Sequence, residues 1–101
     1  MIIHKVVKNE ASVNIAQNRL TFDSQREFRS AVNTVINSPG VDVVNVDMSM
    51  VDYIDSAALG MFLITREAAD AKNVRVRILN CRTTVKQIFE IASFQKLFDI
   101  T

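Results

Sequence analysis

The sequence predicts an α/β fold, in which a mixed sheet of four to five strands carries about three helices packed on it. Residues 41–46 form a β-branched run that is typical of a buried strand. Strand patterns alternate with stretches of helical apolar spacing, which indicates βαβ units with right-handed crossovers. The first two strand patterns are separated by a turn too short for a crossover, so we expect them to pair antiparallel. The sheet is therefore predicted to be mixed.

The N-terminal part contains two strands and one helix. The first strand pattern ends at Val7, a turn follows near residues 9–12, and the second strand extends as far as Leu20. A helix is expected over residues 24–37, with Asp23 or Ser24 as N-cap and Glu27 as the capping-box partner of Ser24. Its buried stripe consists of Phe28, Val32, Val35 and Ile36. The pair Pro39-Gly40 is expected to stop this helix.

The C-terminal part repeats the strand–helix order twice. A strand over residues 41–48 leads through a loop into a second helix that begins at Ser56. We expect the inner face of that helix to comprise Leu59, Phe62, Leu63, Arg66 and Ala69, with Asn73 as its C-cap. A strand over residues 74–79 and a third helix, capped by Thr83 or Thr84, come next. The apolar tail over residues 94–100 is predicted to dock and to end in a short edge strand.

Length and composition favour one globular domain over residues 1–101. Hydrophobic residues make up 49% of the chain, and the formal net charge is +1. A balance so close to neutral argues against nucleic-acid binding, which rests on clustered cations. No apolar stretch approaches the roughly 18–20 residues that cross a bilayer, and the N-terminus lacks the layout of a signal peptide. The single cysteine, Cys81, forms no internal disulfide. These features predict a cytoplasmic protein without membrane insertion.

The sequence offers no set of residues for catalysis, for a metal or for a cofactor. Ser56 is not part of a Gly-x-Ser-x-Gly turn, and no base lies beside it in the sequence. Asp52 and Asp55 are paired carboxylates, but no further ligands at a recognisable spacing join them. Neither Gly40 nor Gly60 lies in a phosphate-binding glycine loop. We therefore expect a protein that is not an enzyme.

The most informative segment is Met48-Ser49-Met50-Val51-Asp52-Tyr53-Ile54-Asp55-Ser56-Ala57-Ala58-Leu59. It resembles the pattern Leu-Ser-x-Val-x-x-Ile-Asp-Ser-x-Gly-Leu of the STAS-domain anti-sigma factor antagonists, and the order of elements over nearly the whole chain resembles that family too. By this resemblance, Ser56 corresponds to the serine that a kinase phosphorylates, and phosphorylation controls partner binding. One departure is Ala58, where the family usually has glycine. We expect its methyl group to lie beside Ser56 and to limit how closely a partner approaches.

The resemblance implies a phosphorylation-controlled regulator in a bacterial partner-switching pathway. Its partners would be a serine kinase or anti-sigma-like protein and a serine phosphatase; one response regulator carrying both activities also fits. The partner-binding surface is expected to comprise Ser49, Met50, Asp52, Asp55, Ser56, Ala57 and Met61. The sequence does not choose the pathway output, and it leaves a monomer and a weak dimer open, since the first strand is an exposed edge.

Other interpretations remain beside this one. Ser56 is also at the place of an ordinary N-cap, which is the commonest reason for a serine at a helix start. A different function on the same fold is a constitutive STAS-type accessory subunit of a lipid-transport ABC system, in which Ser56 contributes only packing or hydrogen bonding. A small-ligand module is a third alternative.

Overall fold

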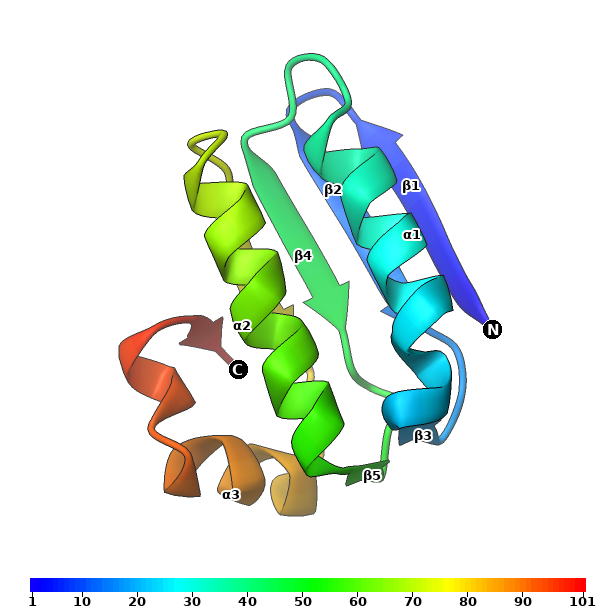
Figure 1. Cartoon of the computed structure of the whole chain (residues 1–101), viewed down its shortest axis with the longest axis vertical. Coiled ribbons are helices and arrows are strands. Elements are labelled where there is room, and N and C mark those ends of the chain that lie inside the picture. Colours follow the sequence, from blue (N-terminus) through cyan, green and yellow to red (C-terminus); the bar gives the residue numbers. More distant parts are fainter.

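In the computed structural model, which describes residues 1–101, a five-stranded sheet carries helices on one face (Figure 1). The strands follow the spatial order β1-β2-β4-β6-β7, in which β1 and β2 are antiparallel and all the other neighbours are parallel. A second sheet consists of β3 and β5 only. The elements are β1 Ile2–Val7, β2 Glu10–Ile15, β3 Arg19–Leu20, the 3-10 turn Phe22–Ser24, α1 Gln25–Ile36, β4 Val43–Asp47, β5 Tyr53–Ile54, α2 Ser56–Asp70, β6 Arg75–Leu79, α3 Thr83–Ile91, the 3-10 turn Phe94–Lys96, and β7 Asp99–Ile100. The predicted fold class is confirmed, including the mixed sheet and the edge strand at the C-terminus.

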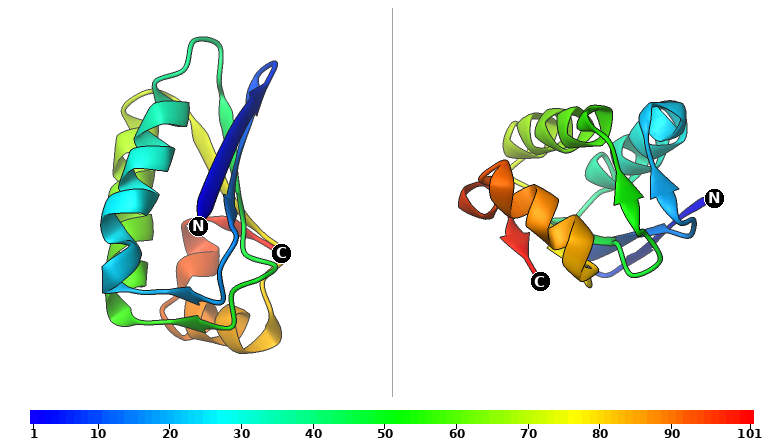
Figure 2. Two further views of the ribbon diagram at one scale, coloured as in Figure 1. Left: turned by 90° about the vertical axis from the view of Figure 1, so that its right-hand side faces the viewer. Right: turned by 90° about the horizontal axis from the view of Figure 1, so that it is seen from below.

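The molecule has two layers, which Figure 2 shows edge-on. Helices α1 and α2 lie side by side on one face of the sheet, and α3 lies across the end where β4 and β6 finish. The opposite face of the sheet carries no helix. Alternation along the strands matches this arrangement, since Val44, Val46, Val76 and Ile78 are buried toward the helices.

A cluster of aromatic rings joins the helices to the C-terminal tail. Phe62 of α2 packs edge-to-face on Phe28 of α1 and Phe89 of α3, with ring centroids 5.3 and 5.4 Å away. Phe98 lies 6.2 Å from the same ring, and Phe94 stacks on Phe89 and Phe98. Edge-to-face and offset pairs are the favoured geometries of aromatic rings. This cluster therefore fixes α2, and with it the loop before α2, relative to the rest of the chain.

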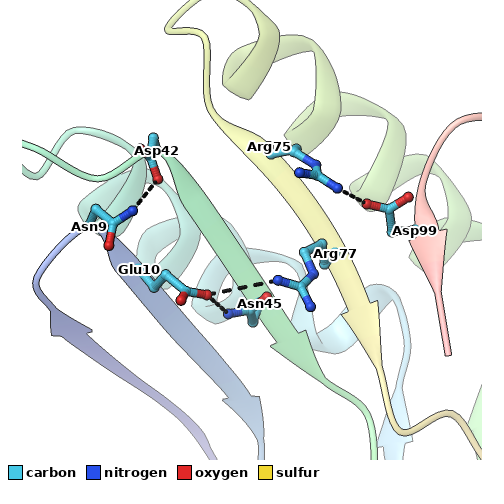
Figure 3. A network of polar contacts seen from close by, with 7 residues as sticks. All are labelled: Asn9, Glu10, Asp42, Asn45, Arg75, Arg77 and Asp99. Atoms are coloured by element: carbon cyan, nitrogen blue, oxygen red, sulfur yellow. Dashed lines mark hydrogen bonds and ion pairs between the residues drawn. The ribbon is translucent and has the colours of Figure 1, made fainter.

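The uncovered face of the sheet is crossed by a polar network (Figure 3). Glu10 of β2 accepts a hydrogen bond from Asn45 of β4 at 3.0 Å and lies 3.9 Å from Arg77 of β6. Arg75 contacts Asp99 of β7 at 2.7 Å. These contacts link β2, β4, β6 and β7, so side chains on the solvent-facing side of the sheet stabilise its parallel strand pairs. The alternation of Arg75 and Arg77 with buried residues thus marks one face of a strand.

Two predicted details of the first helix and its entry are wrong. A 3-10 turn precedes α1, and although Ser24 stands at the N-cap position of α1, its backbone is already helical and its side chain makes no capping hydrogen bond to that helix. Its hydroxyl instead accepts a hydrogen bond from the Gln17 amide at 3.0 Å, while Glu27 accepts one from the backbone N–H of Ile2. The second strand also ends before Leu20, which belongs to β3 and pairs with β5.

The predicted faces of α2 and α3 need correction as well. Leu63 is 43% exposed, because α2 points Ala58, Met61, Phe62, Thr65 and Ala69 into the core. The N-cap of α3 is Arg82, so Thr83 and Thr84 lie inside the first turn and no side chain caps it. Asn73 follows α2 with a φ of 57°, in the left-handed region expected for its role.

Candidate functional site

The loop that carries the predicted site leaves the sheet at the carboxyl end of β4 and reaches α2 through β5. Its buried residues are Met48, Val51 and Ile54. Its exposed residues are Ser49, Met50, Asp52 and Tyr53. The loop is therefore anchored in the core at short intervals and presents the intervening side chains to solvent.

The backbone of this loop is held by hydrogen bonds to three other residues, Asp47, Arg82 and Asn18. The N–H of Ser49 donates to Asp47 Oδ1 at 2.9 Å, and Arg82 Nε donates to the carbonyl of Ser49 at 2.9 Å. The N–H of Asp52 donates to the carbonyl of Asn18 at 2.9 Å. Ser49 thus takes part through its backbone, and its exposed side chain is free for contacts.

Asp55 ties the start of α2 to the start of the first helical segment. It is the N-cap of α2, and its Oδ1 accepts a hydrogen bond from the N–H of Ala58 at 2.9 Å. Its Oδ2 accepts one from the N–H of Phe22 at 3.1 Å. One carboxylate therefore satisfies backbone donors of two elements that are far apart in the sequence.

Ser56 is the first residue of α2, and it is exposed. The capping position belongs to Asp55, so the interpretation of Ser56 as an N-cap is wrong. Its hydroxyl makes no hydrogen bond within the chain, whereas both oxygens of the neighbouring Asp55 side chain are engaged. The serine at this helix start is accordingly not required by local backbone geometry.

Two neighbours of Ser56 lie elsewhere than expected. Ala58 is fully buried, so its methyl group packs into the core and does not limit the approach of a partner. Met61 is 3% exposed and also belongs to the core, whereas Met50 is 50% exposed on the loop. The cause is the phase of α2, which turns positions 58 and 61 inward while Ser56 points outward. Ala57, beside Ser56, is half-buried.

Exposed apolar side chains that were not expected to belong to the partner-binding surface surround this region. They are Phe22, Tyr53, Leu63 and Ile64, of which Phe22 is the most exposed at 67%. Leu63 follows Ser56 by seven residues and so lies on nearly the same face of α2, about 10 Å further along it. The signal was present in the sequence: the run Met61-Phe62-Leu63-Ile64 is apolar on all sides of a helix, more than one buried stripe requires.

A model of the STAS domain family matches residues 4–101. The chain belongs to the STAS domain family. A STAS-domain containing protein of Pseudomonas aeruginosa is 36% identical over 85 residues, which is 84% of this chain and 82% of that protein.

Solved structures share the STAS fold of this chain. An anti-sigma factor antagonist from Mycobacterium paratuberculosis superimposes with a TM-score of 0.84 at 12% identity, over 99% of this chain and 83% of that one. The Bacillus cell fate determinant SpoIIAA in its phosphorylated form gives a TM-score of 0.75 at 16% identity, over 100% of this chain and 91% of that one. None of the helices of this STAS domain is long and apolar enough to span a membrane.

Proposed function

We propose that this STAS domain is a protein-binding regulator whose partner is released when Ser56 is phosphorylated. The observation that carries the proposal is the exposed Ser56 hydroxyl, which makes no hydrogen bond because Asp55 caps the helix. A kinase needs an accessible hydroxyl that can leave its present surroundings without breaking the fold. Ser56 meets both requirements.

The partner surface proposed here surrounds Ser56 and continues along α2. From the loop it includes Ser49, Met50 and Asp52, all exposed, and at the helix start Asp55 and Ala57. It extends beyond the expected residues to the exposed Leu63 and Ile64. Apolar side chains surrounded by polar ones are typical of protein interaction sites. Met61 is left out because it is buried.

Phosphorylation would oppose binding by simple electrostatics and desolvation. A phosphoserine brings roughly −1.5 to −2 charge at neutral pH, beside the acidic Asp52 and Asp55. Under a bound partner the phosphate must lose water, and an unpaired buried charge costs about 3–4 kcal/mol or more. That loss weakens binding some hundredfold to thousandfold. The partners are a serine kinase or anti-sigma-like protein and a phosphatase, in a bacterial partner-switching pathway.

The experiment compares Ser56→Ala and Ser56→Asp in binding to the protein that the wild type captures in its native host. Ser56→Ala should bind like the wild type, and Ser56→Asp should bind at least tenfold more weakly. Intact-mass measurement of the protein from cells should show a phosphorylated species that Ser56→Ala lacks. Equal binding by both folded variants, with no phosphorylated species, would instead favour the constitutive transporter subunit.

A further inference from the structure

A groove along the outer side of α1 lies next to the Ser56 region but outside the partner surface described above. It has a volume of about 690 Å³. It is lined by Phe22, Asp23, Gln25, Arg26, Arg29 and Asn33. Phe22 also contributes to the neighbouring hollow, which Asp55 and Tyr53 line, and its N–H binds the Asp55 carboxylate. The groove is thus continuous with the start of α2.

The two arginines of this groove differ from the others in the chain. Neither Arg26 nor Arg29 forms an ion pair or donates a side-chain hydrogen bond, and both are exposed. Each of the other arginines has a partner: Arg66, Arg75 and Arg77 form ion pairs, Arg82 binds a backbone carbonyl, and Arg19 lies over the Tyr53 ring. The one carboxylate of the groove, Asp23, pairs with neither Arg26 nor Arg29. The groove therefore carries two guanidinium groups that form no ion pair within the chain.

Phe22 is equally unusual among the phenylalanines. The chain has six, and the other five are buried in the aromatic core. Phe22 is 67% exposed and lines both the groove and the neighbouring hollow that contains Asp55, the residue before Ser56. An exposed aromatic ring next to guanidinium groups that have no ion pair is a combination found at protein interaction sites, where aromatic residues and arginine are enriched.

We propose that this groove binds an acidic segment of a partner protein, with an apolar side chain of that segment against Phe22 and its carboxylates on Arg26 and Arg29. Guanidinium groups recognise carboxylates in bidentate geometry. A nucleic acid is the poorer fit, because the cationic site is limited to two side chains, includes Asp23, and belongs to a chain of net charge +1. The proposal deepens the proposed function, since it adds a second contact region for the partner that Ser56 controls.

The test is a titration of the ¹⁵N-labelled full chain with a synthetic amphipathic peptide of alternating glutamate and leucine. The expected result is a set of amide shifts centred on residues 22–33 and extending at most to Asp55, whose carboxylate binds the N–H of Phe22. Arg26→Glu with Arg29→Glu should weaken peptide binding about tenfold or more, since two charge-assisted contacts become repulsive. The matched control, Lys72→Glu with Lys96→Glu, changes the net charge equally at exposed positions outside the groove and should bind like the wild type. Phe22→Ala should weaken the leucine-containing peptide but not one with alanine in place of leucine.

Several outcomes would overturn the proposal. One is equal weakening of peptide binding by the two double variants, and another is a set of amide shifts centred away from residues 22–33. Tighter binding of a single-stranded oligonucleotide than of the peptide would also contradict it. So would shifts that follow protein concentration without peptide, which would indicate a second copy of the chain in the groove. Far-ultraviolet circular dichroism checks that each variant is folded. The titration requires no phosphorylation, so its failure leaves the Ser56 switch standing, while failure of the Ser56 variants leaves the titration unaffected.

Discussion

At the scale of single residues, Asp55 determines what Ser56 is free to do. Because the Asp55 carboxylate accepts hydrogen bonds from Ala58 and Phe22, the backbone needs nothing from the Ser56 hydroxyl. Structural and regulatory roles are thus divided between two adjacent side chains. This division explains how a group at a helix start can be modified while the helix remains capped.

Replacement of Asp55 tests this division. Asp55→Ala removes two hydrogen bonds to backbone donors and should lower the free energy of unfolding by about 1–3 kcal/mol. Ser56→Ala removes no hydrogen bond and should change it by less than about 0.5 kcal/mol. Urea denaturation followed by circular dichroism measures both. Similar destabilisation by the two variants would show that Ser56 has a structural role after all.

Cys81 follows β6, and its burial raises the pKa of its thiol. It is half-buried, and burial is the main cause that raises the pKa of its thiol to about 11, with the nearby Asp47 adding to the effect and Lys86 opposing it. The thiolate is the reactive form, so a raised pKa lowers the reactive fraction at every pH below it.

Alkylation by iodoacetamide near neutral pH should accordingly be about tenfold or more slower in the folded chain than in the urea-unfolded chain, because the smaller thiolate fraction outweighs the greater nucleophilicity of a thiolate of higher pKa. The rate in the folded chain should continue to rise with pH up to about 11. Mass spectrometry of the alkylated species measures the rate. Equal rates in the two states would contradict the raised pKa.

At the scale of elements, α2 uses two faces for two purposes. Its inner face joins the aromatic core through Phe62, and its outer face places Leu63 and Ile64 in solvent along the direction of Ser56. A helix with one buried stripe would carry polar residues at those outer positions. The outer apolar residues are therefore better explained by binding than by folding.

Phe62 is the residue on which this arrangement depends. Its ring contacts Phe28, Phe89 and Phe98, which belong to α1, α3 and the tail. Phe62→Ala should lower the free energy of unfolding by about 3–5 kcal/mol, whereas Leu63→Ala on the next, half-exposed position should cost under about 1 kcal/mol. Chemical denaturation of both variants distinguishes them, and comparable losses would contradict the assigned faces of α2.

The sequence predicted element types better than it predicted which side of an element faces the core. Strand and helix patterns and the short first turn were sufficient for the mixed sheet, because period and connection length are local properties. The phase of α2 was not predictable, since apolar residues occur on all sides of it around Met61-Phe62-Leu63-Ile64. The position of Asp55 just before the second helix is typical of a residue that bonds the backbone at a helix start. Its bond to Phe22, 33 residues away, depends on tertiary structure.

At the scale of the whole molecule, the surfaces with proposed roles lie on the helical side and at the end of the sheet where β4 finishes. The opposite face of the sheet is crossed by its own network of ion pairs and hydrogen bonds. A modification at Ser56 therefore acts on an end of the molecule that is supported by buried apolar packing and by hydrogen bonds to the backbone, some of them made by the side chains of Asp47, Asp55 and Arg82. None of these contacts uses the Ser56 hydroxyl.

Phosphorylation of Ser56 should consequently leave the fold and its stability almost unchanged. A phosphate at the first position of α2 is favoured by the helix N-terminus by about 0.3–1 kcal/mol. The negative charges of Asp55 and the exposed Asp52 oppose it by a similar amount. We expect the free energy of unfolding to change by less than about 1 kcal/mol, and amide shifts to be confined to the loop, the start of α2 and the neighbouring Phe22. Thermal melts and ¹⁵N spectra of phosphorylated and unmodified protein measure both quantities. Shifts spread through the β-sheet, or a large loss of stability, would mean that release of the partner comes from unfolding rather than from charge at the contact surface.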